Sequence, residues 1–213
     1  MDDIVIYGFP VSTYVRSARL IFEEKSIAYR NEPVDFTLPD YRALHPWAKI
    51  PSLRHGALVL YETSAILRYG AEAFEGPSFV PETVLGRARM EQWISAINAY
   101  MDKTMTRAYI IERLAPKVLG RPSDEAAIAA ALPEIDRQLG IIDESLARQA
   151  YLADEAISLA DLLLAPILAY LRKLPDAAPL VAKHASVARW IEAMEARPAM
   201  AATDPEPPVE TAA

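Results

Sequence analysis

Short apolar runs alternate with helical periodicity over the first third of the chain. Residues 4–8 form an almost continuous apolar run, which is typical of a buried strand. After Ser12 and Thr13, two hydroxyl residues suited to a helix start, apolar residues recur at helical spacing as far as Ile27. The same pattern predicts the elements that follow. They are a strand over residues 29–34, an irregular stretch over 36–48, a hairpin that begins at Pro51 and returns over 57–61, and a helix over about 64–74.

The pattern changes after residues 75–81, a segment rich in proline and glycine. Beyond it no stretch predicts a strand. Apolar residues repeat every three or four positions over residues 90–101 and again over 128–146, so each stretch predicts one face of a long helix. Pro133 interrupts the second stretch. Because proline inside a helix costs roughly 3 kcal/mol, we expect a kink there or the start of a new helix.

This order of elements predicts two domains. The succession strand, helix, strand, short helix, two strands and helix resembles the thioredoxin fold, with one mixed four-stranded sheet. The sequence therefore predicts an α/β N-terminal thioredoxin-like domain followed by an all-α C-terminal helical domain. The expected bounds are residues 1–75 for the first domain, 76–83 for the linker, 84–200 for the helical domain and 201–213 for a tail, which its proline-rich composition predicts to be disordered.

Composition narrows the chemistry that the chain can perform. Its 213 residues are 52% hydrophobic, enough for a full core, and the net charge of −7 argues against nucleic acid as a main partner. Without cysteine, the chain can form no disulfide and offers no cysteine nucleophile. Three histidines without ligand spacing argue against a metal site, and no apolar run is long enough to span a membrane. With no secretory signal visible, the expected location is the cytoplasm.

Two neighbouring stretches give the clearest sign of a binding site. Pro51 stands at the start of a strand, where it cannot donate a hydrogen bond to the sheet and marks an edge or a special backbone geometry. Glu62 and Thr63 end the next strand and open a helix, whose free backbone N–H groups attract anions. Together they predict a pocket for a small peptide that carries a carboxylate. An ordinary hairpin that leads into a helix is the alternative.

This arrangement resembles the glutathione-binding site of the glutathione S-transferase family. The resemblance implies that the peptide bond between Ile50 and Pro51 is cis and that the backbone of Ile50 pairs with the cysteinyl part of glutathione. It also implies that Glu62 and Thr63 bind the γ-glutamyl group. The family more often has serine at the position of Thr63, and the exchange keeps a hydroxyl and a backbone N–H.

Two stretches of the second half strengthen the resemblance. In residues 158–161, the Ser158 hydroxyl can accept from the Asp161 N–H, while the Asp161 carboxylate can reach back to the Ser158 N–H. With Ile157 before it and an apolar helix after it, this box looks like the folding signature of the family's second domain. Residues 189–198 are similar to the family's closing helix. The resemblance covers about residues 3–200, and the chain is identified as a member of the family.

Ser12 is the candidate for activating the glutathione thiol. The thiol attacks electrophiles as the thiolate, and a hydroxyl donor beside a helix N-terminus favours that anion. The resemblance places Ser12 where serine-type members keep this hydroxyl, which makes it the catalytic residue and a glutathione contact. A simple helix cap is the alternative for Ser12. Thr13, Tyr14 and Tyr7 stay open as donors, although a tyrosine within a strand, such as Tyr7, is more often part of the core.

Two features of some family members are missing. Without cysteine, thiol–disulfide exchange through the protein is excluded. Where several serine-type members have a basic pair well before the proline, this chain has Phe36 and Thr37. Lys49 is the nearest substitute for binding the glycyl carboxylate of glutathione, with Trp47 and His45 as weaker candidates. A solvated surface lysine is the alternative reading of Lys49.

The second substrate is expected to bind against the helical domain, with Tyr14 at the mouth of its pocket. In this family the helix after the linker faces the first domain, and methionine and tyrosine give an adaptable apolar wall. The residues that this helix offers are Tyr100, Met101, Met105, Arg107 and Tyr109. The same side chains could equally form core or dimer contacts.

The resemblance therefore predicts a homodimeric detoxification enzyme with glutathione as its co-substrate and no metal. The thiolate would attack a small apolar electrophile by substitution or conjugate addition, and neither nucleic acid nor membrane is an expected partner. Alternatives on the same fold are a glutathione-dependent lyase, isomerase or peroxidase, or a module that binds glutathione or a partner without turnover, since fold does not decide function.

Overall fold

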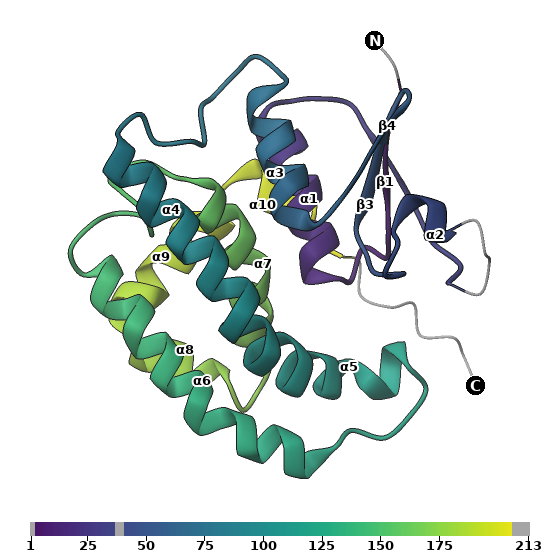
Figure 1. Cartoon of the computed structure of the whole chain (residues 1–213). Helices are drawn as coiled ribbons and strands as arrows, with labels where there is room; N and C mark the ends of the chain where they lie inside the picture. The colour runs from purple at the N-terminus through teal and green to yellow at the C-terminus, as the bar shows by residue number, and fades with distance from the viewer. Residues whose placement is uncertain (1–2, 37–40, 206–213) are drawn as a thin grey trace.

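The computed structural model describes residues 3–36 and 41–205. A mixed four-stranded sheet forms the first domain, in the order β2-β1-β3-β4. β1 (Ile4–Tyr7) runs parallel to β2 (Arg30–Glu32) and antiparallel to β3 (Ser52–His55), which pairs with β4 (Leu58–Tyr61). Helices α1 (Thr13–Glu24) and α3 (Thr63–Glu72) pack on one face, and the short α2 (Tyr41–Leu44) lies on the other (Figure 1). This confirms the thioredoxin-like fold, with a short helix inside the stretch expected to be irregular.

The described residues after β4 form helices and no further strand. A long run of helix comes first, made of α4 (Val84–Ala96), a π-helical segment η1 (Ile97–Ile110) and α5 (Ile111–Val118), and it bends between α4 and α5 (Figure 1). The helices that follow in the described residues are α6 (Glu125–Leu146), α7 (Leu159–Lys173), α8 (Ala178–Lys183), α9 (Ala185–Glu195) and α10 (Pro198–Ala202). Helix α7 lies innermost among them, as Figure 1 shows, and α8 and α9 pack against it.

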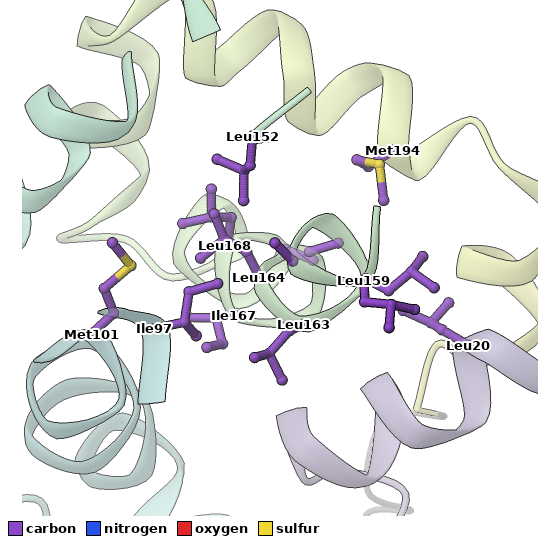
Figure 2. Packing of buried hydrophobic residues seen from close by; sticks show 14 of the residues in the cluster. Leu20, Ile97, Met101, Leu152, Leu159, Leu163, Leu164, Ile167, Leu168 and Met194 are labelled. Carbon is purple, nitrogen blue, oxygen red and sulfur yellow. The ribbon is translucent and has the colours of Figure 1, made fainter. Parts of the chain in front are cut away.

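Helix α7 forms the centre of the helical domain. It is apolar nearly all round, which is typical of a helix buried on every side. In Figure 2 its side chains meet residues from four other parts of the chain, which are Leu20, Ile97 with Met101, Leu152 and Met194. Each buried leucine contributes about 1.5–3 kcal/mol relative to an exposed one, so this helix holds the surrounding elements together.

A fully buried carboxylate fixes the start of α7. Asp161 accepts from the Ser158 backbone N–H at 2.9 Å and from the Ser158 hydroxyl at 2.7 Å. It also accepts from the backbone N–H of Leu152 at 2.9 Å and from the indole N–H of Trp190 at 3.1 Å. The predicted reach of Asp161 back to the Ser158 N–H is confirmed. Because Trp190 belongs to α9, its bond to this carboxylate also ties the start of α7 to α9.

Pro133 lies inside α6, which runs without interruption from Glu125 to Leu146. The alternative of a new helix at this position is therefore wrong. Packing explains the continuity, because the core face of α6 includes Ile128, Ile135, Leu139 and Ile142, each no more than 1% exposed. Their burial keeps the helix intact on both sides of the proline.

Hydrogen bonds and ion pairs tie the helical domain to the linker and to the first domain. In the segment before α4, the carbonyl of the buried Phe79 accepts from the Leu159 N–H at 3.0 Å. Arg16 of α1 is 3% exposed and binds the carbonyl of Met200 at 2.8 Å and the carboxylate of Asp204 at 3.1 Å. Arg197 forms two hydrogen bonds to Glu24, of 2.6 and 2.7 Å. Helix α10 and the residues after it thus close against the first helix of the thioredoxin-like domain.

Candidate functional site

Two adjoining cavities lie between the sheet domain and the helical segments η1 and α5. The smaller has a volume of about 240 Å³ and is lined on the sheet side by Lys49, Ile50, Pro51, Glu62 and Thr63. The structure therefore brings all of the residues expected around glutathione, apart from Ser12, to one cavity. On the opposite side the same cavity meets η1 through Asn98, Asp102 and Arg107.

The backbone around the smaller cavity follows the expected geometry. The Ile50–Pro51 peptide bond is cis, as predicted. Glu62 has a φ of 69° and sits at the N-cap of α3, while Thr63 is 5% exposed at the first position of the helix. Because the first N–H groups of a helix have no partner within the helix, this end of α3 presents donors to a carboxylate.

Tyr41 holds the loop before Pro51 in place. Its hydroxyl donates to the carbonyl of Lys49 and lies 3.2 Å from the hydroxyl of Ser52. This fixes the backbone at Lys49, whose side chain is exposed at the edge of both cavities. The Tyr41 bonds explain how one short helix, α2, orients the loop that carries Lys49 and Ile50.

His45 and Trp47 differ from Lys49 as candidates for binding the glycyl carboxylate. His45 lines the smaller cavity but is only 2% exposed, and burial lowers its pKa, which favours the uncharged imidazole. Its ring packs against that of Tyr61, with the two ring centroids 5.2 Å apart. Trp47 is 63% exposed and lines neither cavity. Lys49 is the cation that the described loop offers at this point.

The larger cavity has a volume of about 340 Å³ and a mostly apolar lining. Ser12, Thr13 and Tyr14 line it at the start of α1, and Phe9 and Phe36 add aromatic surface. Tyr14, Lys49, Ile50 and Arg107 line both cavities, so these four residues mark the junction between them. Thr37, the second residue of the missing basic pair, lies outside the described residues.

Ser12 is the N-cap of α1. Its Oγ accepts a hydrogen bond from the Val15 N–H at 3.4 Å. Because this bond uses the oxygen as the acceptor, the hydroxyl proton can donate to a group in the cavity. The helix-cap reading and the role in thiolate binding are thus compatible in one side chain.

The other candidate donors occupy different surroundings. Tyr14 donates to the Oδ1 of Asn98 at 3.1 Å, and burial together with the Asp102 carboxylate raises its pKa, so it stays a neutral phenol. Thr13 is 4% exposed, and its hydroxyl has no hydrogen-bond partner among the described residues. Tyr7 lies in β1 beneath the guanidinium of Arg54 and lines neither cavity.

The wall that η1 contributes differs from the expected one. Met101, Met105 and Tyr109 are no more than 4% exposed and belong to the core, whereas Tyr100 is 68% exposed; none of the four lines either cavity. The hydroxyl of Tyr109 accepts from the Ala177 N–H at 3.0 Å. Of the residues expected from this helix, Arg107 alone lines the cavities. The rest of the wall that the helices contribute to the larger cavity is Thr106, Ile110, Ile111, Leu114, Val118 and Leu119.

The geometry of η1 explains this difference. The Ile111 N–H bonds to the carbonyl of Thr106, five residues earlier, as in a π-helix. The apolar face predicted over residues 90–101 is buried, and the alternative of core contacts holds for Met101, Met105 and Tyr109. The one sequence signal that fits is the spacing of Asp102 and Arg107, which are five apart and form an ion pair of 3.1 Å.

Within residues 3–36 and 41–205, no cluster of His, Asp and Glu has the arrangement of a metal site. The helices of the same residues include none that is long and apolar enough to cross a membrane.

Comparison with known proteins gives consistent matches along the chain. The family model described as glutathione S-transferase, N-terminal domain, matches residues 6–78, and the one for the C-terminal domain matches residues 97–198. Glutathione S-transferase 3 of Zea mays is 31% identical over 210 residues, which cover 95% of this chain and 94% of the relative.

Solved structures agree with these matches. Glutathione S-transferase III in its apo form superposes with a TM-score of 0.88 and 33% identity, over 97% of this chain and 99% of the other. The theta-class enzyme from the citrus canker pathogen Xanthomonas axonopodis pv. citri, solved with glutathione bound, has a TM-score of 0.81 and 29% identity, over 100% and 99% of the two chains.

Proposed function

The chain belongs to the glutathione S-transferase family, and on this basis we propose that it is a transferase that joins the sulfur of glutathione to a small apolar electrophile. The observation that carries the proposal is the meeting of two cavities, one lined by Pro51, Glu62 and Thr63 and the other mostly apolar. Ser12 lines the apolar cavity together with Tyr14, which lines both cavities. This arrangement suits a peptide thiol on one side and an apolar partner on the other.

Glutathione would lie along the smaller cavity. The backbone of Ile50 would pair with its cysteinyl unit, while Glu62 and the N-terminal end of α3 at Thr63 would bind the γ-glutamyl group. Lys49 would bind the glycyl carboxylate, since it is a cation on the adjacent loop and His45 is neutral. Each of these roles matches a polar group to a charge of the opposite sign or to a hydrogen-bond partner.

Ser12 would lower the cost of forming the thiolate. The thiol releases its proton to water, and the Ser12 hydroxyl then donates a hydrogen bond to the sulfur anion at the N-terminal end of α1. The thiolate attacks the electrophilic carbon in the larger cavity. In a substitution the new sulfur–carbon bond replaces the bond to a leaving group, which departs with its electron pair.

Two measurements test this function. Calorimetric titration should show that the protein binds glutathione, and turnover with an activated aryl chloride should release chloride and the glutathione thioether. Binding without turnover of any electrophile would favour a non-catalytic glutathione-binding module instead. Product analysis would separate transfer from lyase, isomerase or peroxidase chemistry.

We also propose the expected domain bounds, which are 1–75 for the first domain, 76–83 for the linker, 84–200 for the helical domain and 201–213 for the tail.

We propose further that the protein is a homodimer that acts in detoxification in the cytoplasm. Exposed apolar side chains near the site support a second copy as partner, because Trp47 is 63% and Tyr100 68% exposed. Light scattering should give twice the chain mass for the wild type, and a Trp47→Ala variant should shift the equilibrium to the monomer. A monomeric wild type at micromolar concentration would refute the dimer.

A further inference from the structure

Charge is distributed unevenly over the two cavities. The described lining of the larger cavity contains two cations, Lys49 and Arg107, and no carboxylate, although the whole chain carries a net charge of −7. The smaller cavity contains Glu62 and Asp102 as well. The charged side chains around an apolar electrophile in the larger cavity would therefore all be positive. They lie at the junction, because Lys49 and Arg107 line both cavities.

Arg107 is held in position by its own helix. Its Nε donates to the Oδ2 of Asp102 at 3.1 Å, and no described residue accepts from the two terminal nitrogens of its guanidinium. The Arg107 side chain is 52% exposed, so these two nitrogens can reach a molecule at the junction. Because the proposed function assigns Lys49 to the glycyl carboxylate, Arg107 is the remaining cation of this lining that can bind the electrophile.

The residue before Arg107 adds a second donor. Thr106 lines the same cavity and is 5% exposed, and its hydroxyl has no hydrogen-bond partner among the described residues. A buried hydroxyl without a partner is costly. An oxygen atom on the bound substrate would satisfy it, whereas a purely hydrocarbon or halogenated substrate would not.

From these contacts we infer that the larger cavity selects α,β-unsaturated ketones and aldehydes with an apolar body, whose carbonyl oxygen is bound by Arg107 and Thr106. The inference rests on the proposed transfer function and names its substrate class. In this reaction the thiolate sulfur forms a bond to the β-carbon, and the electron pair of the C=C bond shifts so that negative charge accumulates on the carbonyl oxygen. Water then protonates the α-carbon, and glutathione has added across the double bond without a leaving group.

The position of Arg107 favours conjugate addition over displacement of a halide. Charge on an enolate oxygen stays two carbons from the attacked atom, close to the sulfur and hence to the junction. In a displacement at saturated carbon, the halide departs on the side opposite to the sulfur and away from the junction. A guanidinium at the junction therefore stabilises the first transition state more than the second.

The test compares two substrates with the same phenyl body, trans-4-phenyl-3-buten-2-one and benzyl chloride. In Arg107→Met, kcat/KM for the enone should fall by about 10- to 100-fold, whereas kcat/KM for benzyl chloride should change by less than about threefold. The expected loss is smaller than for a fully buried oxyanion donor because Arg107 is half exposed. Arg107→Lys should recover part of the enone activity, and Thr106→Val should lower the enone activity selectively. Lys103→Met, an exposed cation of the same helix that lines neither cavity, is the matched control and should leave both rates unchanged.

Each other outcome has a definite meaning. Equal losses with both substrates in Arg107→Met would show that the arginine serves the thiolate, which overturns the inference and leaves the proposed function intact. A wild type that converts benzyl chloride and not the enone would also overturn it. A wild type that fails to bind glutathione in calorimetry would refute the proposed function, and the inference with it.

Discussion

At the scale of the residue, the site depends on side chains at the boundaries of elements. Ser12 caps α1, Glu62 occupies the N-cap position of α3 without a capping bond from its side chain, and Thr63 opens α3. The backbone N–H groups in the first turn of a helix have no partner within the helix. They are therefore free to bind a ligand beside the side chains at these positions. Ser12 uses its oxygen for the helix and keeps its proton for a ligand.

Replacing Ser12 by alanine should slow conjugation without abolishing glutathione binding. The thiolate would lose one hydrogen bond to a charged group, which is worth about 1.5–3 kcal/mol, so the rate at pH 7 should fall by about 10- to 100-fold. The pH dependence of thiolate absorbance in the enzyme–glutathione complex measures this effect directly. Superimposable titrations and equal rates in the two proteins would reduce Ser12 to a helix cap and turn attention to Thr13 and Tyr14.

Glu62→Ala and Thr63→Ala should each weaken glutathione binding by roughly 10- to 100-fold, because each removes a hydrogen bond to a charged group worth about 1.5–3 kcal/mol. Calorimetric titration gives the affinity and urea unfolding the stability, which should change much less. Glu82→Ala removes an exposed carboxylate outside both cavities and serves as the control. Unchanged affinity in both site variants would contradict the assignment of this cavity to glutathione.

At the scale of the element, the sequence predicted what depends on local pattern. The strands, α1, α3 and the box at Ser158 and Asp161 follow from apolar periodicity and capping residues, and the sheet topology follows from their order. The face that η1 turns to the cavity does not, because it depends on how η1 packs against distant elements such as α6 and α7. The wall of the larger cavity was therefore out of reach of periodicity, whereas the residues at turns and caps were not.

Asp161→Ala should be among the most destabilising single changes in the helical domain. Four donors, among them the Trp190 indole, would lose their acceptor in a fully buried place, and each buried unsatisfied donor costs about 1–3 kcal/mol. Asp124→Ala removes an exposed cap of α6 and should cost only about 1 kcal/mol. Urea unfolding of the two variants measures the difference, and equal losses would show that the buried network adds nothing to a simple cap.

Pro133→Ala should stabilise the protein. Pro133 is exposed within the unbroken α6, where alanine restores a backbone donor and is favoured by up to about 3 kcal/mol. A rise in the urea midpoint at constant slope is the expected result. A lower midpoint would mean that the ring of Pro133 makes packing contacts worth more than the hydrogen bond that it prevents.

At the scale of the whole molecule, the helical domain completes the first one. The two cavities lie between them, and α10 with Asp204 closes on α1 through Arg16. Arg16→Met should lower stability by about 1–3 kcal/mol, because the buried carbonyl of Met200 loses its guanidinium donor, whereas the Asp204 side chain is 41% exposed and keeps its bond to Lys173. A single unfolding transition, recorded by both Trp fluorescence and far-ultraviolet circular dichroism, would show that the domains unfold together. Two separate transitions in the wild type would contradict this coupling.

The contact between Arg16 and residues 200–204 also sets an order of events during synthesis. At about 5–20 residues per second, the ribosome adds Asp204 roughly 10–40 s after Arg16. Once Tyr61 has been added the sheet has all of its strands, yet until Asp204 follows the guanidinium on α1 lacks the carbonyl and carboxylate that bind it in the finished protein. The domain that is translated first therefore reaches its final packing only when translation has passed residue 204.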